Sequence, residues 1–440
     1  MLVQKYISGD STVKIARSIE EAVAGGKIAA GELLPAVRPL AVHLGVSPAT
    51  VAASYRLLQD RGVLVADGRR GTRVRHAAPI AAPAETPLPA GVRDLQEGNP
   101  DLALLPDLDA AMRRVQVGQR VYGHELNEPA LLELAREQFR ADRVPSTHIS
   151  VVSGALDGIE RVLREQLRAG DRVAVEDPCF TGVLDLLNAL SLVPVAVAVD
   201  DEGPRPEALR KALRSAEAVI VTPRAQNPFG SAITAKRARE LRMVLASFPE
   251  AMVIEDDHAG PVAGAPYVTL IDAARTRWAV VRSTSKSLGP DLRVAVLASD
   301  AHTHMRVEGR QTLGIRWVSH VLQRLVVSLW SSRATQKLLG RAERVYGERR
   351  DALLRELATH GIRAHGASGL NVWIPVPEET AVVQALLHAG WGVKAGERYR
   401  LETPPAIRVT IAALEPRDAA RFAADLASIL MPRRRVSATT

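Results

Sequence analysis

The chain has 440 residues, about three times the size of a common domain, so a single small module is excluded. Its 57 Lys and Arg residues against 49 Asp and Glu residues give a net charge of +8, which is compatible with polyanionic partners. With 47% hydrophobic and 4% aromatic residues, the composition excludes the disordered and fibrous classes and a surface of many base-stacking aromatics.

The cysteine content and the lengths of the apolar runs indicate the cellular compartment of the protein. A single cysteine, Cys179, excludes an internal disulfide and a cysteine-built zinc site. No apolar run approaches the ~18 residues of a membrane span, and the first residues lack the layout of a signal peptide. We therefore expect a cytoplasmic protein without a membrane partner.

Residues 1–76 are predicted to form three helices and a hairpin. Apolar residues recur at helical spacing at Val13, Ile15, Ile19, Ala22 and Val23, before Gly25-Gly26. A second helix follows Pro35 and ends at Gly45, and Ser47 caps a third. Residues 63–74 alternate apolar and polar on either side of residues 66–69, which predicts a hairpin. This order is typical of a winged helix-turn-helix.

Positive charge gathers on the hairpin. Between residues 56 and 76, Asp60 and Asp67 stand against six arginines, at positions 56, 61, 69, 70, 73 and 75. A tip of glycines and arginines fits a DNA groove, because glycine permits close approach while guanidinium groups meet phosphates. A solvated charged hairpin explains the composition equally well, and the preceding helix pair is what favours DNA.

The segment resembles the DNA-binding domain of the GntR family of bacterial repressors. The shared motif runs from Leu34 to Ala41, continues through residues 44–47 and 50–51, and ends with Gly71-Thr72. The resemblance implies that double-stranded operator DNA is contacted by Arg38, Ser47, Ala49, Thr50, Arg69, Arg70 and Gly71. Pro48 departs from the basic or polar residue common at its position.

The remaining chain is predicted to be an α/β unit. Residues 77–90, rich in Ala and Pro, predict a semi-rigid linker to residues 91–440. Beyond it, helical stretches alternate with apolar runs at 149–152, 172–176, 193–198, 218–222, 252–255 and 278–282. Such alternation predicts a largely parallel sheet, whose ligands gather at the carboxyl ends of the strands, and the length favours two subdomains.

Lys286 is the sharpest candidate for chemistry at those strand ends. It follows an apolar run and the three hydroxyl residues Ser283, Thr284 and Ser285, and Arg293 lies seven positions further along the chain. Most lysines in loops are simply solvated. Here the hydroxyls and the arginine fit a bound phosphate, and a partly desolvated lysine forms a Schiff base with an aldehyde. A lysine, a phosphate site and a buried acid are the requirements of pyridoxal phosphate.

Residues 91–430 resemble the fold-type I aminotransferases, and the whole chain resembles the MocR subfamily of GntR regulators. The resemblance implies a large subdomain with a mainly parallel sheet, a smaller α+β subdomain, a homodimer and bound pyridoxal 5'-phosphate. It implies that Lys286 forms the Schiff base, Asp256 pairs with the pyridine nitrogen and Asn227 hydrogen-bonds the phenolic oxygen.

Further residues take roles by the same resemblance. Phe180 is implied to stack on the cofactor ring, and the phosphate is implied to contact Gly154, Ala155, Ser283, Ser285 and Arg293. Tyr122 matches a tyrosine that reaches the phosphate from the partner subunit. Arg408 matches the arginine that grips the carboxylate of a substrate or effector. No metal is implied.

Two positions depart from the family pattern. His258 stands where the family has a tyrosine that donates to the phenolic oxygen, and we expect its titration near neutrality to couple to that of the Schiff base. Asn371 replaces a histidine common in MocR proteins. Several motifs are nearest to the PtsJ-type branch, which is linked to vitamin B6 homeostasis.

Each of these residues alone also fits an ordinary role, as a helix cap, a core side chain or a surface ion pair. Their conjunction at successive strand ends favours a cofactor site. The sequence thus predicts a transcription regulator that senses pyridoxal phosphate and controls genes of vitamin B6 metabolism, with an amine or amino acid as a candidate second effector. The alternative is a competent aminotransferase that carries a DNA-binding domain, and we expect at most slow transamination.

Overall fold

The computed structural model describes residues 3–60, 63–66, 71–75, 88–116, 118–272 and 274–430. Wing-tip residues Arg69 and Arg70 lie outside these ranges, as do residues 77–87 of the predicted linker. The domain boundaries at residues 76 and 90 therefore stay predictions. The chain divides into two compact units.

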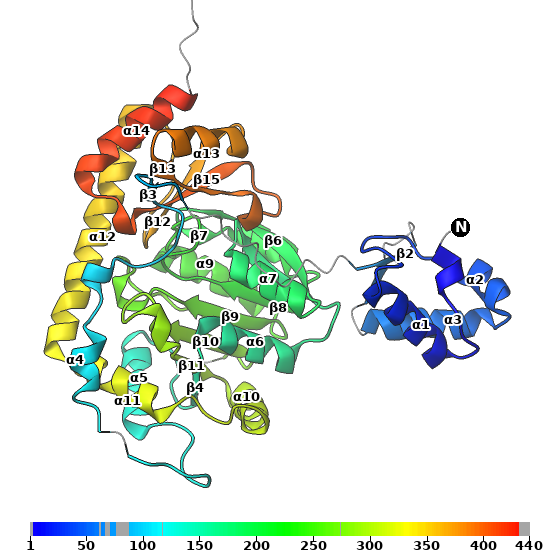
Figure 1. Ribbon diagram of the computed structural model, residues 1–440. Helices are drawn as coiled ribbons and strands as arrows, with labels where there is room; N and C mark the ends of the chain where they lie inside the picture. The colour runs from blue at the N-terminus through cyan, green and yellow to red at the C-terminus, as the bar shows by residue number, and fades with distance from the viewer. Residues whose placement is uncertain are drawn as a thin grey trace, which may run out of the picture. The chain divides into compact units, whose positions relative to one another are not determined.

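The amino-terminal part has the predicted three helices and hairpin (Figure 1). Its elements are η1 (Val3–Tyr6), α1 (Thr12–Ala24), α2 (Val37–Leu44), α3 (Pro48–Asp60), β1 (Leu64–Ala66) and β2 (Thr72–Val74). Strands β1 and β2 pair antiparallel. Gly45 ends α2 with a φ of 66°, a left-handed conformation that glycine adopts without a Cβ clash. Ser47 caps α3, because its Oγ accepts the backbone N–H of Thr50 at 3.1 Å.

The predicted apolar stripe forms the core of this part. Ile15, Ile19, Leu40 and Leu58 are completely buried. Val13 belongs to the same run but is 62% exposed, because two residues before Ile15 a side chain projects from nearly the opposite side of a helix.

An eight-stranded mixed sheet forms the centre of the larger part. In spatial order it contains β4 (Ile149–Val152), β11 (Ala295–Ser299), β10 (Trp278–Ser283), β9 (Met252–Asp257), β8 (Ala218–Val221), β5 (Arg172–Asp177), β6 (Val193–Asp200) and β7 (Gly203–Pro204). All six predicted strands are present. Strands β8, β9 and β10 pair parallel, which brings their carboxyl ends to one edge. Strand β11, which the sequence analysis missed, pairs antiparallel with β10 and β4.

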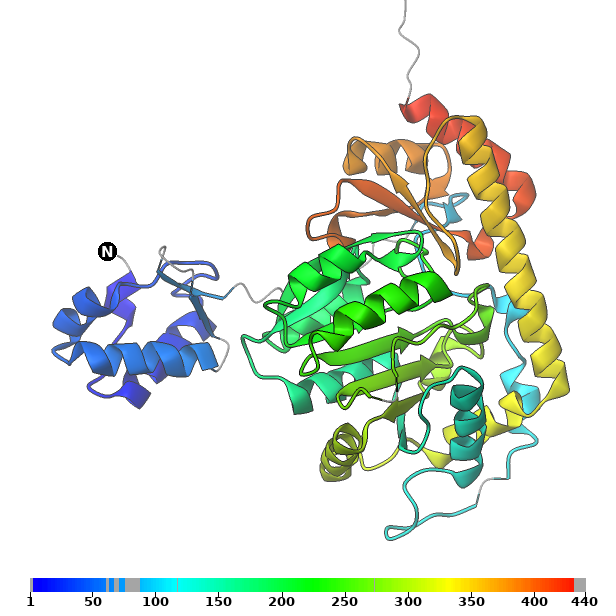
Figure 2. The same ribbon diagram turned by 180° about the vertical axis from the view of Figure 1, so that it is seen from behind.

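Helices cover both faces of this sheet. They are α4 (Leu108–Met112), α5 (Pro129–Ala141), α6 (Ala155–Gln166), α7 (Thr181–Ala189), α8 (Pro206–Ala212), α9 (Ala235–Ala246), α10 (Ala301–Leu313) and α11 (His320–Trp330). Helix α6 lies on one face, and α9 lies over the other (Figures 1 and 2). Short 3-10 helices are η3 (Leu102–Leu104), η4 (Gly260–Val262), η5 (Pro290–Leu292), η6 (Glu397–Tyr399) and η7 (Ile411–Ala413).

A smaller subdomain follows the long helix α12 (Arg333–Thr359), which runs beside both sheets (Figures 1 and 2). An antiparallel sheet orders β12 (Asn371–Pro375), β15 (Ala406–Thr410) and β14 (Lys394–Ala395). Helices α13 (Glu379–His388) and α14 (Pro416–Leu430) accompany it, and β13 (Trp391–Gly392) pairs with β3 (Arg93–Asp94). The predicted α/β class with a larger and a smaller subdomain is confirmed.

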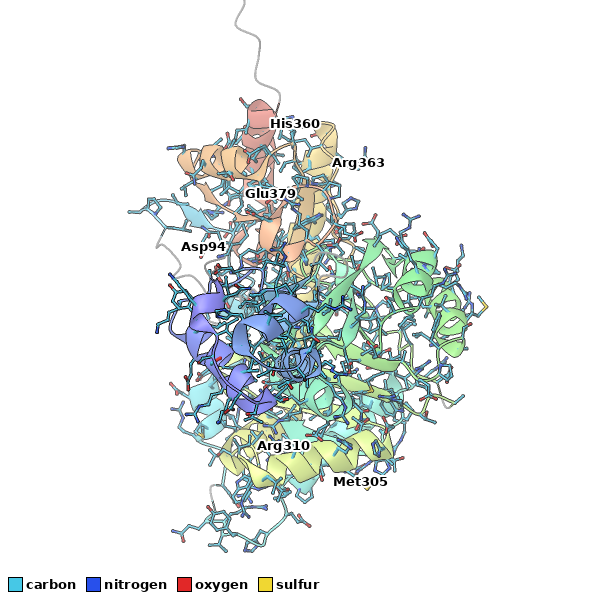
Figure 3. The ribbon with its side chains drawn as sticks, turned by 90° about the vertical axis from the view of Figure 1, so that its right-hand side faces the viewer. Asp94, Met305, Arg310, His360, Arg363 and Glu379 are labelled. Carbon is cyan, nitrogen blue, oxygen red and sulfur yellow. The ribbon has the colours of Figure 1, made fainter. Side chains whose placement is uncertain are left out.

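Buried Glu379 holds the turns of this subdomain together (Figure 3). Its carboxylate accepts the backbone N–H groups of Glu397 at 2.7 Å and Ala406 at 3.0 Å, and it pairs with Arg400 at 2.8 Å. These charge-assisted bonds fix the segment between β14 and β15, next to Tyr399 and before Arg408.

Candidate functional site

One cavity of about 590 Å³ opens at the carboxyl ends of β8, β9 and β10. We call it the strand-end cavity. Its walls include the predicted residues Ala155, Phe180, Asn227, Asp256, His258, Ser283, Ser285, Lys286, Arg293 and Arg408. The strand ends of the large sheet bring most of these side chains together. Arg408 joins them from β15 of the smaller subdomain.

Lys286 lies in the turn that follows β10. Its Nζ donates to the carbonyl oxygen of Gly98 at 2.5 Å. Burial, together with the positive charge of Arg408, lowers the pKa of Lys286 to about 8. The amine is therefore neutral, and nucleophilic, in a substantial fraction of molecules at mildly alkaline pH.

Asp256 at the end of β9 presents a polar atom that lacks a partner. Its Oδ1 is buried and makes no hydrogen bond within the described part of the chain. Burial, and then the negative charge of Asp257, raise the pKa of Asp256 to about 7. A buried carboxylate without a donor is costly, so this site fits a group that brings both an N–H and a positive charge.

The charge of Asp257 is held by two arginines that the sequence analysis missed. Arg224 binds its carboxylate with two bonds of 2.9 and 3.0 Å, and Arg282 adds one of 2.7 Å. These guanidinium groups hold the pKa of Asp257 well below its usual range despite burial. Arg282 also contacts Asp142 at 2.5 Å. Asp257 therefore stays charged beside Asp256.

His258 differs from its expected behaviour. Burial, and then the positive charge of Lys286, lower the pKa of His258 to about 4, so the imidazole of the cofactor-free protein is neutral at pH 7. The coupling to a Schiff base stays a prediction. Its Nε2 lies 2.8 Å from the carbonyl oxygen of Ala225. A carbonyl only accepts, so Nε2 carries the proton and Nδ1 of the neutral ring is an acceptor. His258 cannot donate from Nδ1 as a tyrosine hydroxyl would.

A cradle for an anion surrounds the start of α6. Gly154 has a φ of 99°, and a Cβ at this position would lie 2.9 Å from Nη2 of Arg293. Arg293 Nη2 donates to the carbonyl oxygen of Ser153 at 3.2 Å, and Ser283 Oγ lies 3.0 Å from Ser285 Oγ. A guanidinium group, hydroxyls and a helix N-terminus are the donors that bind phosphate.

Arg408 lies at the other side of the cavity, on β15. It is buried, and its Nη1 donates to Asn227 Oδ1 at 3.2 Å, while Nη2 contacts the carbonyl oxygen of Gln96. The guanidinium carbon lies 4.9 Å from the centre of the Tyr399 ring. With its oxygen so engaged, Asn227 keeps its NH₂ group for a ligand. Asn371, the other departure, is buried and accepts a bond from Thr410.

The sequence analysis did not single out some other residues of the cavity wall. Glu97, Gly98 and Asn99 come from the segment after β3, and Lys394 pairs with Glu97 at 3.1 Å. These residues lie outside any strand-end motif of the large sheet, so only the folded chain shows that they belong to the site.

Asp177, at the end of β5, ties the two subdomains together beside the cavity. Its carboxylate accepts three backbone N–H groups at 2.8 Å, from Leu401, Glu402 and Thr403. The backbone N–H of Cys179 also donates to the carbonyl oxygen of Tyr399 at 2.6 Å. The loop before β15 is thereby fixed to the large sheet.

Tyr122 does not line the strand-end cavity. It is 75% exposed, lies edge-on to Trp317 at 5.6 Å between ring centres, and carries the guanidinium of Arg316 4.9 Å from its ring centre. Its predicted role belongs to a partner subunit, so that role stays a prediction.

Three of the four predicted DNA-contacting residues of the helices are exposed. Arg38 on α2 is exposed, as are Ser47 and Ala49 at the start of α3, whereas Thr50 is half-buried. Gly71, at the edge of the hairpin, is exposed with a φ of 103°. Individual DNA contacts remain predictions.

The described ranges contain neither a group of metal ligands nor a membrane-spanning helix. No three side chains of His, Cys, Asp or Glu there are grouped so that they would hold a metal ion. In the same ranges no helix combines the length and the apolar character needed to cross a membrane.

Comparison with known proteins gives matches for both parts. Residues 11–74 match the family of bacterial regulatory proteins, gntR family. The vitamin B6 salvage pathway transcriptional repressor PtsJ of Salmonella typhimurium is 37% identical over 96% of this chain and 98% of its own. The pyridoxine biosynthesis transcriptional regulator PdxR of Corynebacterium glutamicum is 27% identical over 88% of each chain.

Solved structures match the larger part. Kynurenine aminotransferase of Pyrococcus horikoshii superposes with a TM-score of 0.70 at 20% identity, over 78% of this chain and 91% of its own. The α-aminoadipate aminotransferase LysN of Thermus thermophilus has a TM-score of 0.69 at 21% identity, over 78% and 92%. At these identities the likeness shows the aminotransferase fold alone.

Proposed function

Because the chain belongs to the MocR-type transcription regulators of the GntR family, we propose that it binds pyridoxal 5'-phosphate and that the bound cofactor changes its affinity for operator DNA. The observation that carries this proposal is the partnerless Oδ1 of Asp256, in the same cavity as the partly neutral amine of Lys286. A protonated pyridine nitrogen would supply the missing donor at Asp256, and an aldehyde would accept the amine of Lys286.

The residues of the cavity fit the rest of this molecule. The cofactor supplies an aldehyde and an electron-withdrawing ring. The partly neutral amine of Lys286 would hold the group through this aldehyde. The backbone amides at Gly154 and Ala155 would hold the phosphate, together with Ser283, Ser285 and Arg293. Phe180 would cover the ring, and Asn227 would donate its NH₂ group to the phenolic oxygen.

The target genes follow from the relatives. PtsJ and PdxR are named for vitamin B6 salvage and pyridoxine biosynthesis. We propose that this chain likewise controls genes of vitamin B6 metabolism, as a dimer. The cofactor then acts as the signal, which requires that it interact differently with the DNA-binding and non-binding arrangements of the protein.

Aminotransferase activity is the second candidate. Arg408 supports it, because a buried guanidinium in the cavity can hold a carboxylate. His258 weighs against it, because its Nδ1 offers no proton to the phenolic oxygen where the tyrosine of the family would donate one. We therefore expect amino-group transfer to be slow or absent.

One experiment separates the two candidates. Operator affinity is measured with cofactor-free and cofactor-loaded protein, beside multiple-turnover transamination on a panel of amino acids and keto acids. The proposal requires that the cofactor shift operator affinity and that turnover be negligible or slow. Robust turnover that Arg408→Ala abolishes, with no effect of cofactor on DNA binding, would establish the enzyme instead.

A further inference from the structure

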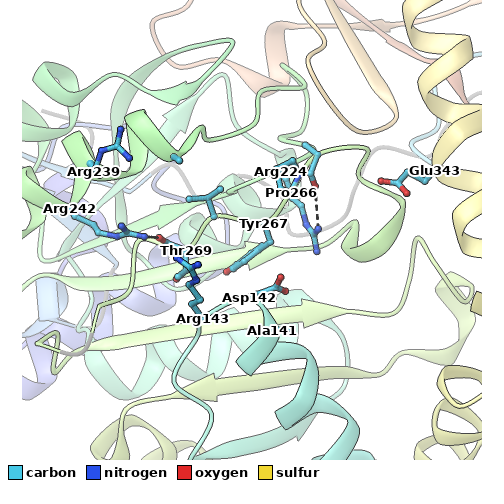
Figure 4. Close-up of a pocket in the computed structure, with 13 residues that line it drawn as sticks. Ala141, Asp142, Arg143, Arg224, Arg239, Arg242, Pro266, Tyr267, Thr269 and Glu343 are labelled. Atoms are coloured by element: carbon cyan, nitrogen blue, oxygen red, sulfur yellow. Dashed lines mark hydrogen bonds between the residues drawn. The ribbon is translucent and has the colours of Figure 1, made fainter.

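A second cavity lies behind the strand ends, on the side of α9. It has a volume of about 790 Å³ and is formed by the end of α5, by α9, by residues 265–269 and by Glu343 of α12 (Figure 4). We call it the arginine pocket, because it is lined by Arg143, Arg224, Arg239 and Arg242. It shares no lining residue with the strand-end cavity.

The charges in the arginine pocket do not balance. Asp142 and Arg224 are already paired, with Arg282 and Asp257 respectively. Arg143, Arg239 and Arg242 form no ion pair with any described residue. The only other acidic group in the lining is Glu343, which lies at the far end of the pocket from Arg143 and Arg242 (Figure 4).

Among these arginines, Arg242 has a buried hydrogen-bond donor without an acceptor in the described chain. Its Nη2 donates to the carbonyl oxygen of Thr269 at 2.5 Å, and its Nε is buried without a hydrogen-bond partner in the described chain. Arg143 reaches toward the same stretch of backbone (Figure 4). A buried guanidinium N–H without an acceptor is costly, so an anion that accepts from Arg242 is stabilised in this pocket.

The position of Arg143 is itself unfavourable. Its φ is 60°, just after the end of α5, where glycine is the favoured residue. A residue with a Cβ is strained in this left-handed conformation. An arginine there therefore puts its side chain into the pocket at a cost in backbone energy.

We propose that the arginine pocket binds a small phosphorylated molecule. Arginine forks match the geometry of phosphate oxygens, and the volume holds a phosphate monoester with a ring-sized organic group. No lysine lines the pocket, so binding is reversible and non-covalent. A phosphate in a DNA backbone fits less well, because the duplex cannot bring it to the buried Nε of Arg242.

The arginine pocket adjoins the strand-end cavity through neighbouring residues. Arg224 lines the arginine pocket and pairs with Asp257, while the next residue, Ala225, bonds to His258. His258 and Asp256 line the strand-end cavity. An anion bound at Arg224 is thus linked to two residues of the strand-end cavity. Asp257, the partner of Arg224, adjoins Asp256 in the chain, and Ala225, the residue after Arg224, bonds to His258.

Inorganic phosphate and phenyl phosphate are the probes. Their binding to the full-length protein, preincubated with pyridoxal phosphate, is followed by calorimetry. The double variant Arg143→Ala/Arg242→Ala should bind phosphate at least about tenfold more weakly, since two charged bonds are lost. The matched control Arg355→Ala/Arg363→Ala removes two exposed arginines elsewhere and should bind as the parent does.

Arg143→Gly guards against misfolding, because glycine fits the local backbone and this variant should stay folded while it loses phosphate affinity. Equal loss in the control, or unchanged affinity in every pocket variant, would overturn the proposal, as would a loss of operator affinity alone, which would indicate a DNA contact. If the protein did not bind pyridoxal phosphate, phosphate would occupy both cavities, and the pocket variants would remove one of two sites. Failure of the proposed function is thereby distinguishable.

Discussion

Lys286 combines burial with a place at the end of a strand, and this combination makes its role testable. Lys286→Ala should abolish visible absorption by the bound cofactor and release the cofactor on dialysis, because the covalent bond is lost. The control is Lys394→Ala, which removes a second lysine from the same cavity, one already paired with Glu97. A spectrum that survives Lys286→Ala but not Lys394→Ala would assign the bond to the other lysine.

Asp256 predicts a pH dependence of stability. Its pKa is raised from 3.8 to about 7, so between these values the unfolded chain has lost a proton that the folded chain retains. The free energy of unfolding of the cofactor-free protein therefore falls as pH rises through this window. Between pH 5 and 7, the free energy of unfolding of Asp256→Asn should decrease by about 2 kcal/mol less than that of the parent, as measured by urea unfolding.

Two other acids and the bound cofactor also affect this pH dependence of stability. Burial also raises the pKa of Glu176 to about 8 and of Glu255 to about 7, so the variant should keep part of the slope. Bound cofactor places a positive charge at Asp256 and should flatten the slope of the parent. Parallel pH curves for parent and Asp256→Asn would show that Asp256 is ionised throughout.

Sequence reasoning found those site residues that follow predicted strands. Asn227, Asp256 and Lys286 each come just after an apolar run, so the rule for parallel sheets was enough to group them. It could not find Gly98 or Tyr399, because nothing in their local sequence tells which distant strand end they meet. The protonation of His258 was also beyond reach, since it depends on burial and on the carbonyl of Ala225.

At the scale of elements, the start of α2 and of α3 offers a test of DNA binding. Arg38 is exposed on α2, and a base-reading arginine contributes about 1–3 kcal/mol to operator affinity. Arg38→Ala should therefore weaken specific binding by that amount at fixed salt, in a fluorescence titration. Arg17→Ala is the matched control, because Arg17 is exposed on α1 and is paired with Glu21. Equal affinities of Arg38→Ala and Arg17→Ala would remove Arg38 from the interface.

Elements differ in how far the sequence defines them. The helices of the amino-terminal part and six strands of the large sheet carry clear apolar periods between glycines, capping residues and polar clusters, and their prediction is confirmed. The sequence analysis missed strand β11, because only the short η5 turn, and no helix, separates it from β10. The expected alternation of strands and helices therefore does not predict it. Strands β13 and β14 are two residues each, too short for any period.

At the scale of the whole molecule, Tyr122 provides a test of the proposed dimer. If Tyr122 completes the cofactor site of the partner subunit, then mixing Tyr122→Ala with Lys286→Ala subunits regenerates one intact site per mixed dimer. We expect each variant alone to retain cofactor poorly and the mixture to recover tight binding in up to half of the mixed-dimer sites, measured by absorbance after dialysis. No recovery in verified mixed dimers would place Tyr122 outside the partner's site.

The Asp177 carboxylate has a mechanical consequence. Three backbone N–H groups of residues 401–403 are anchored to it, immediately before the strand that carries Arg408. Further bonds join the subdomains elsewhere, since the backbone N–H of Ala225 donates to Ser368 Oγ at 2.8 Å. The segment before β15 is therefore coupled to the end of β5, and a displacement of either one is transmitted to the other.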